Sequence, residues 1–309
     1  MTFKDSDFVN LHLHSMYSIQ DSVIKIPKLA MKLKEYNQNA CAITDHSSCA
    51  GWIEFDQVMQ DNQIKPIFGN EFYCRDSYNE PKTRDRDHLV MLAMNQEGLE
   101  NIRRFQRIAV ENFYYKPILS YECLQKYPTD GIYCTSACSL GSVAKNILAD
   151  NIDKAEDYIL FFDNVFNHNF SLELQFHPLY DDQKIINKEL VVLSDNYGIP
   201  LTVSCDSHFV DKTDKNLRRI VQSISWHKKL AEVNDSMDSN CVGSAEIIRN
   251  NALQSGFDDM SIVNNALEQT YVIANRCNAS IRDKSDKIPV FTKHKEFDEI
   301  FSKYGDVNG

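Results

Sequence analysis

Two histidines near the amino terminus, His12 and His14, are spaced for joint metal binding. They alternate with the apolar residues Val9, Leu11 and Leu13. Successive side chains of an extended strand point to opposite faces, so both imidazoles emerge on the same face. Two imidazoles on one face can hold one metal ion, but a half-buried strand whose histidines face water gives the same pattern. The pair gains weight only if further ligands lie elsewhere in the chain.

Later segments end in more side chains of the kinds that bind zinc, manganese or iron, namely imidazole, carboxylate and thiolate. The candidate metal ligands are His12, His14, Asp21, His46, Glu71, His88, Cys138, Asp206 and His208. This set exceeds the roughly four ligands that one zinc ion takes, so it suits a cluster of about two or three divalent ions. Glu71 and Asp206 could bridge pairs of ions, because a carboxylate has two oxygens. Taken alone, each candidate has an ordinary explanation. Cys138, for example, could be a small buried apolar residue rather than a ligand.

Adjacent metal ions suit one kind of chemistry in particular. They clamp the attacking and leaving oxygens of a phosphoryl displacement and lower the pKa of bound water. The number of candidate ligands therefore favours phosphoester hydrolysis over a structural zinc site. Asp45 is expected to orient His46 rather than to bind metal. Glu173 and His177 also lie around a strand end and are candidates for supporting the ligands from behind.

The candidates fall mostly where short apolar segments end. We expect strands at about 9–13, 40–44, 66–72, 88–93, 131–135, 170–176 and 199–205, with helices in most of the intervals between them. This alternation predicts parallel β/α units in a closed or nearly closed barrel, with a doubly wound open sheet as the alternative. Chemistry in such a barrel sits where strands end. His88 is the exception, since it starts its strand and reaches the same mouth only if that strand runs against its neighbours.

Bulk composition narrows the class of protein. The chain has 309 residues, of which 43% are apolar, and a formal net charge of −11. That charge argues against a protein that coats nucleic acid by bulk electrostatics, but bound cations can reverse the local sign in one cleft. Nine cysteines without a Cys-x-x-Cys pair, and no amino-terminal signal segment, predict free thiols in the cytoplasm. No apolar run approaches the roughly 20 residues of a membrane span, so no membrane association is expected.

The pattern changes after about residue 211, where helices are expected at 217–231, 244–255 and 260–277. We therefore predict a barrel over residues 1–210 and a helical appendage over 211–309. Residues 74–87 are strongly charged and are expected to form a loop. Within it, Arg84 and Arg86 lie beside the ligand ends, but we interpret them as part of a solvated surface.

The segments that carry the ligands resemble the polymerase and histidinol phosphatase (PHP) superfamily. The similar motifs are His12-Leu13-His14-Ser15, Ile43-Thr44-Asp45-His46, Gly69-Asn70-Glu71, His88-Leu89-Val90, Ser136-Ala137-Cys138 and Asp206-Ser207-His208. The sequence is most similar to the PHP domain at the front of bacterial DNA polymerase III alpha subunits, over about residues 8–280. The resemblance implies an α/β fold, a distorted (βα)7 barrel with a trinuclear metal site. Every ligand position here holds a metal-binding residue, which favours an active site.

An intact domain of this kind in polymerases is associated with metal-dependent 3′–5′ exonuclease activity, so the resemblance implies the same activity here. We therefore expect a phosphodiester hydrolase acting on single-stranded 3′ ends of DNA, together with a DNA polymerase or another replisome partner. The residues expected to take part in catalysis are His12, His14, Asp45, His46, Asp206 and His208. One alternative is a small-molecule phosphatase of the histidinol-phosphate type, and another is a non-catalytic scaffold that docks on a polymerase. The sequence stops about where a polymerase palm would start, so we expect no polymerisation by this chain alone.

Overall fold

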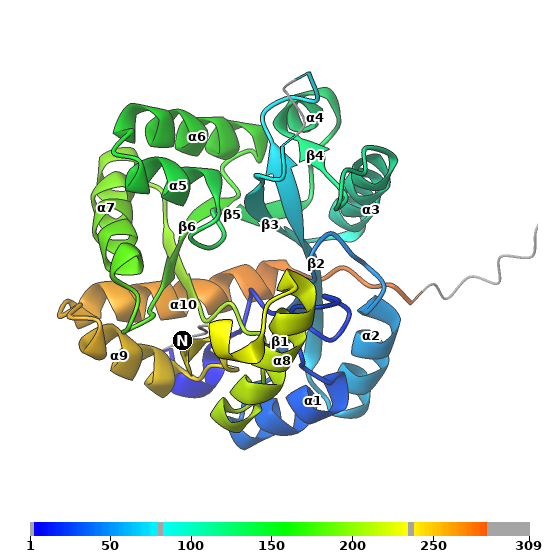
Figure 1. The fold of residues 1–309 in the computed structure, drawn as a ribbon, viewed down its shortest axis with the longest axis vertical. Helices are drawn as coiled ribbons and strands as arrows, with labels where there is room; N and C mark the ends of the chain where they lie inside the picture. Colours follow the sequence, from blue (N-terminus) through cyan, green and yellow to red (C-terminus); the bar gives the residue numbers. More distant parts are fainter. Residues whose placement is uncertain (1–2, 80–82, 234–237, 283–309) are drawn as a thin grey trace, which may run out of the picture.

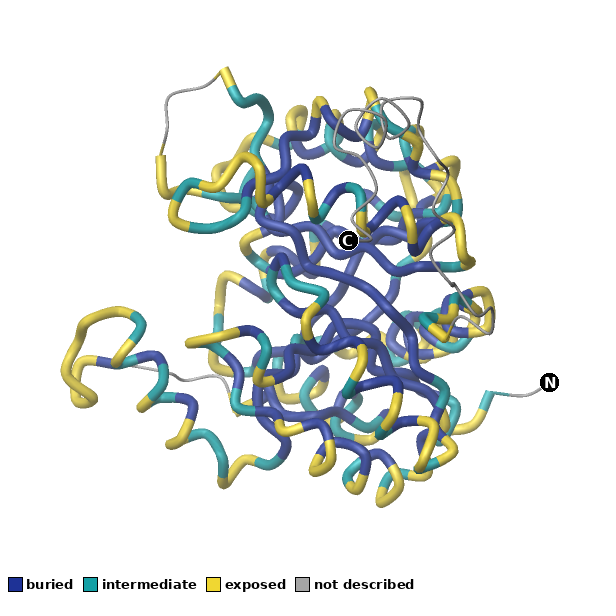
Figure 2. The backbone as a smooth tube through the Cα atoms, turned by 90° about the vertical axis from the view of Figure 1, so that its right-hand side faces the viewer, coloured by how far each residue is buried: buried dark blue, intermediate teal, exposed yellow. Residues whose placement is uncertain are grey.

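The computed structural model describes residues 3–79, 83–233 and 238–282. It is a mixed α/β fold with a curled sheet whose main strand order is β1-β2-β3-β5-β6-β7, with β4 beside β2 (Figure 1). The strands are β1 (Ala40–Ile43), β2 (Lys65–Arg75), β3 (Asp87–Ala93), β4 (Leu119–Ser120), β5 (Ile132–Thr135), β6 (Phe170–Gln175) and β7 (Leu201–Ser204). Their burial is nearly complete, and exposed backbone gathers on the surrounding helices and loops (Figure 2).

The amino-terminal segment closes this sheet into a barrel. Asn10 forms a parallel bridge to Cys41 in β1, and Leu13 forms one to Ser207 just beyond β7. On one side the backbone N–H of Ala42 donates to the Asn10 carbonyl at 2.8 Å. On the other, the N–H of His14 donates to the Ser207 carbonyl at 2.9 Å. The expected distorted barrel is therefore confirmed. Its amino-terminal segment, residues 9–14, is held by isolated bridges rather than by a continuous strand.

Strand β3 runs against both of its neighbours in an otherwise parallel barrel. It pairs antiparallel with β2, where Glu71 faces Val90, and with β5, where Val90 faces Thr135. The pairs β1–β2, β5–β6 and β6–β7 are parallel. The start of β3 therefore lies at the edge where β2 and β5 end, and this brings His88 to the mouth of the barrel. The condition that the sequence set for His88 is met.

Helices fill the intervals between strands and extend beyond β7. They are α1 (Ile26–Glu35), α2 (Trp52–Asp61), α3 (Gln96–Glu111), α4 (Tyr121–Lys126), α5 (Ser142–Leu148), α6 (Ile152–Val165), α7 (Asp181–Tyr197), α8 (Lys215–Trp226), α9 (Ala245–Gln254) and α10 (Met260–Arg276). The α8 helix ends earlier than expected because His227 takes a left-handed conformation with φ of 53°. β4 and α4 were not expected, since elements of two and six residues are too short to show periodicity.

Helix α10 packs on β7 and completes the apolar interior of the barrel. Its residues Ile273 and Ala274, and Cys277 just after it, belong to the same buried cluster as Val9 and Leu11 of the amino-terminal segment. The Thr270 hydroxyl also accepts a hydrogen bond from the backbone N–H of Val9 at 3.1 Å. Figure 1 shows α10 in orange, running across the molecule. The division at residue 210 stays a prediction, and the chain beyond residue 282 lies outside the described residues.

Within the described ranges, no helix combines the length and the apolar character that crossing a membrane requires.

Candidate metal centre

The amino-terminal segment places His12 and His14 in the mouth of the barrel, where both rings are buried. The Nε2 atom of His12 lies 3.1 Å from Oε1 of Glu71 and 3.3 Å from Oδ1 of Asp206. The Nε2 atom of His14 lies 3.3 Å from the other Glu71 oxygen and 3.2 Å from the same Asp206 oxygen. Strand β2 thus places one carboxylate, and the turn after β7 another, where each contacts both histidines.

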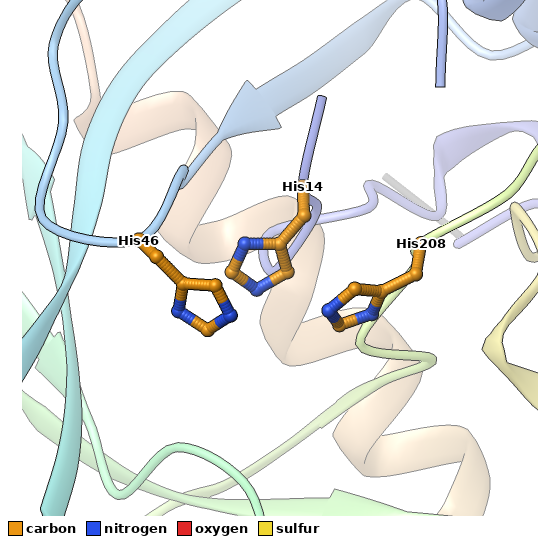
Figure 3. Close-up of side chains that lie close together, drawn as sticks. All are labelled: His14, His46 and His208. Carbon is orange, nitrogen blue, oxygen red and sulfur yellow. The ribbon is translucent and has the colours of Figure 1, made fainter. Parts of the chain in front are cut away.

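A second group of side chains lies around Asp21, in the turn that follows the amino-terminal segment. Its Oδ2 atom lies 2.9 Å from Nε2 of His46 and 3.3 Å from Nε2 of His208. The Nδ1 atom of His46 lies 2.7 Å from Oε2 of Glu71, which joins this group to the first. Figure 3 shows the ring of His14 between those of His46 and His208, with ring centres 4.2 and 4.4 Å away.

The last two candidates come from β3 and from the turn after β5. The Nδ1 atom of His88 lies 3.0 Å from Oε1 of Glu71. The thiol of Cys138 lies 3.5 Å from that nitrogen and 3.9 Å from that oxygen. All of the predicted ligands are therefore brought together, with Glu71 at the centre of the group.

These donors fit divalent metal ions. Three trios have ligand atoms that lie within 4.8 Å of one another: His14, His46 and His208; His12, His14 and Asp206; and His46, Glu71 and His88. Several buried atoms of the group have no hydrogen-bond partner among the described residues: Nε2 of His12 and His14, Nδ1 of His46, Oε2 of Glu71 and Oδ1 of Asp206. Buried polar atoms seldom stay unsatisfied, and bound cations would supply partners for these atoms.

Glu173 orients His12 from behind, as the sequence suggested. Its Oε1 atom lies 2.7 Å from Nδ1 of His12. Glu173 also accepts hydrogen bonds from the hydroxyls of Thr135 and Ser204. Burial raises the pKa of Glu173, but His12 outweighs burial and leaves it below its usual value. An ionised carboxylate only accepts, so Nδ1 of His12 donates its proton to Glu173, and Nε2, which faces Glu71 and Asp206, is the nitrogen left to bind a metal.

Asp45 supports the ligands through a serine. It accepts hydrogen bonds from the backbone N–H of Ser15 at 2.7 Å and from the hydroxyl of Ser18 at 2.6 Å. The Ser18 oxygen in turn lies 3.0 Å from Nδ1 of His14 and accepts from the N–H of His46 at 3.1 Å. Because the hydroxyl proton goes to Asp45, Ser18 accepts from the His14 ring, whose Nε2 atom is then free for a metal.

Two residues from the helical region were missed by the sequence analysis. Arg218 donates to a carboxylate oxygen of Asp21 at 3.3 Å, and its side chain is buried. The carbonyl of Asn240 accepts from the N–H of His208 at 2.8 Å, and its amide donates to the Asp206 carbonyl at 2.9 Å. Neither residue lies in a motif, so only the three-dimensional structure reveals their contacts.

Electrostatics among the candidate ligands are set by competition between burial and opposite charge. Burial raises the pKa of Glu71, but His88, His12 and His46 outweigh it and hold this pKa well below its usual range. Burial lowers the pKa of His46, but Glu71 and Asp21 raise it to about 10. Burial holds the pKa of the Cys138 thiol well above its usual value. The thiolate of Cys138 therefore needs a cation beside it.

Above the group lies a pocket of about 510 Å³, whose lining includes Tyr73, Arg86, Lys116 and Trp226. His177 also lines this pocket, but its ring contacts the side chains of Gln175 and Ser239 rather than the ligand group. Burial lowers the pKa of His177 to about 4, so its ring is neutral near pH 7.

The curled barrel and its donor set define a metal-binding α/β domain. The family model described as the PHP domain matches residues 10–177, which is more than half of the chain. The protein belongs to this family, as its motifs suggested.

Several relatives align with most of this sequence. DNA polymerase III subunit alpha of Borreliella burgdorferi is 36% identical over 285 residues, which cover 90% of this chain and 24% of that protein. The same subunit of Aquifex aeolicus is 30% identical over 238 residues, covering 74% of this chain and 20% of that protein. The chain thus spans about a quarter or less of these relatives. Among solved structures, an amidohydrolase from Chromobacterium violaceum aligns with 65% of this chain and 87% of its own, at 15% identity and a TM-score of 0.42.

Proposed function

We propose that this protein is a metal-dependent phosphodiester hydrolase that removes nucleotides from single-stranded 3′ ends of DNA. The observation that carries this proposal is the convergence of the candidate ligands on Glu71, whose carboxylate contacts four imidazoles, those of His12, His14, His46 and His88. A structural site would need fewer donors, whereas about two or three adjacent cations suit phosphoryl displacement.

The proposed ligands are His12, His14, Asp21, His46, Glu71, His88, Cys138, Asp206 and His208. They suit zinc, manganese or iron, because imidazole, carboxylate and thiolate are the donors that these ions take. Bound divalent ions would supply Lewis acidity, which neutralises phosphate oxygens and makes water more acidic. The residues proposed for catalysis are His12, His14, Asp45, His46, Asp206 and His208.

The chain's own residues hold this donor set in place. Glu173 fixes the tautomer of His12, and Ser18 with Asp45 fixes that of His14. Burial of these rings excludes water from the ligand atoms and strengthens every electrostatic contact among them. The substrate phosphate would enter from the pocket above, which is open to solvent and lined by polar side chains.

The proposal of a DNA substrate is supported by the relatives, which are DNA polymerase III alpha subunits. We accordingly propose a role in replication, a polymerase or other replisome partner, and a cytoplasmic location. We also propose that residues 1–210 form the hydrolytic barrel and 211–309 its helical appendage. The small-molecule phosphatase remains a second candidate, favoured by the net charge of −11.

The test is release of nucleotides from a 3′-labelled single-stranded oligonucleotide by protein loaded with manganese or zinc. Release that stops with a chelator, and in a His12→Ala and His14→Ala double variant, would support the proposal. Absence of release by protein that contains bound metal would contradict it. Faster turnover of a small phosphomonoester than of the oligonucleotide would favour the phosphatase instead.

A further inference from the structure

Cations lie close to tyrosine rings in the lining of the pocket above the candidate metal centre and just outside that lining. The Arg86 guanidinium lies 5.5 Å from the centre of the Tyr73 ring, and the Lys116 ammonium lies 5.8 Å from the same centre. Tyr73, Arg86 and Lys116 all line the pocket. Adjacent to them in the chain, Arg84 stacks on the exposed ring of Tyr115 at 4.0 Å. We call these five residues the cationic rim.

The cationic rim adjoins the candidate metal ligands directly. The ring of Tyr73 stacks on that of His46, with centres 5.1 Å apart and planes 17° apart. Its edge also meets the ring of His88 at 5.2 Å. Arg86 and Lys116 flank a ring that touches two candidate ligands, so an anion held by them would lie next to a phosphate at the metal centre.

The cations of the rim are not used up by internal ion pairs. Across residues 3–79, 83–233 and 238–282, none of Arg84, Arg86 and Lys116 pairs with a carboxylate, whereas nearby Lys145 pairs with Asp85 at 2.7 Å. The Nε atom of Arg86 is buried and has no hydrogen-bond partner within those residues. In an acidic protein, cations that have no carboxylate partner within the described part of the chain and lie beside a candidate metal centre are available to bind an anionic ligand.

We propose that the cationic rim binds the phosphates of a single-stranded polynucleotide that precede the scissile one. This inference rests on the proposed function and names the residues that would hold the substrate strand beside that site. Arginine and lysine hold phosphates by charge-assisted hydrogen bonds, and exposed aromatic rings stack on unpaired bases. A small phosphomonoester has a single phosphate, which would bind at the metal centre itself. Such a substrate would have no phosphate left to contact the rim. The rim thus bears on the net charge of −11, since it places two cations, Arg86 and Lys116, in the lining of the pocket.

A measurement of DNA binding tests the cationic rim separately from catalysis. Fluorescence anisotropy of a labelled single-stranded oligonucleotide in chelator reports affinity without cleavage. We expect Arg86→Ala and Lys116→Ala each to weaken binding about tenfold and to reduce the slope of log affinity against log salt by about 0.7, the value for one lost phosphate contact. Tyr115→Ala should weaken binding while keeping that slope, because stacking releases no counterions. Arg107→Ala and Lys188→Ala are matched controls, since both side chains are exposed and neither lines the pocket.

Each outcome decides one of the two proposals. Wild-type affinity and an unchanged salt slope in Arg86→Ala and Lys116→Ala would overturn the rim, even if the protein degrades DNA. Weakened binding with a smaller slope would support the rim, even if no preparation releases nucleotides, in which case the hydrolase proposal fails alone. With active protein, the same two variants should raise KM for the oligonucleotide more than they lower kcat. An Arg86→Lys variant should bind the oligonucleotide more tightly than Arg86→Ala, because the positive charge is kept.

Discussion

Glu71 and His88 contact each other diagonally across an antiparallel strand pair, with Oε1 of the carboxylate 3.0 Å from Nδ1 of the imidazole. Glu71 lies in the interior of β2, two residues before Tyr73, which pairs with His88 at the start of β3. Only the reversed direction of β3 makes this contact. Within the ligand group, the reversal supplies a donor that a uniformly parallel barrel would place at the opposite end.

Replacing Glu71 by glutamine should remove the common partner of the metal cluster. The amide keeps the shape of the side chain but lacks the charge that offsets two or more cations. We expect loss of at least one bound ion and a fall in hydrolysis of about 100-fold or more, since a ligand should matter at least as much as the residues that orient ligands, which change activity by about 10–100-fold. Elemental analysis and nucleotide release measure the two effects.

A matched control for this change is Glu122→Gln, which alters an exposed carboxylate on α4 and should keep full metal content. Full occupancy in Glu71→Gln would contradict the central position given to this carboxylate.

Glu173 offers a test of the residues behind the ligands. Glu173→Gln can present its NH₂ group to Nδ1 of His12, which would favour the wrong tautomer and turn the proton toward the metal side. We expect metal affinity to fall by about 10–100-fold while the fold is kept. Competition with a fluorescent chelator gives the affinity, and circular dichroism gives the folded fraction. An affinity equal to that of the wild type would mean that the tautomer of His12 is set by something else.

The sequence located the ligand group well because its signal is local. Alternation around His12 and His14 fixes their shared face, and His46, Asp206 and His208 follow apolar runs that had to be buried strands. The direction of β3 could not be deduced, since a period of two reads the same both ways. For this reason His88 could be placed only conditionally, and the antiparallel pairs of β3 decide it.

Contacts between distant segments were not predictable. Arg218 lies on an amphipathic helix like many others, and its hydrogen bond to Asp21 spans nearly 200 positions of the chain. The cationic rim shows the same limit. Arg86 read as a solvated residue in a charged loop, because Tyr73 and Lys116, which accompany it, come from two other segments.

Metal uptake should release protons. The pKa of His46 is raised to about 10, because Glu71 and Asp21 outweigh the opposing burial. Its ring is therefore protonated near neutral pH in the metal-free protein, and a ring nitrogen that holds a proton cannot bind a cation. Apparent metal affinity should thus rise as the pH rises from about 6 toward 10. Calorimetric titration in two buffers of different ionisation enthalpy should give different heats.

His168→Ala is the control for that experiment, since this exposed imidazole pairs with Asp163 away from the ligand group and should not change the number of protons released. Heats that are independent of buffer would contradict this prediction, because they would show that metal binding releases no net proton from the ligand group, which includes the imidazole of His46 and the thiol of Cys138.

Helix α10 should contribute to the stability of the barrel itself. Ile273 is fully buried in the apolar interior beside Val9 and Leu11, while its neighbour Val272 is 42% exposed. Ile273→Ala should lower the free energy of unfolding by about 2–5 kcal/mol, the cost of a cavity in a packed core. Val272→Ala should change it by no more than about 0.5 kcal/mol. Urea denaturation of both variants measures the difference. If α10 were a separate appendage, Ile273→Ala would leave the main unfolding transition of the barrel unchanged. A single cooperative transition that moves as a whole would instead show that residues beyond 210 and the barrel fold as one unit.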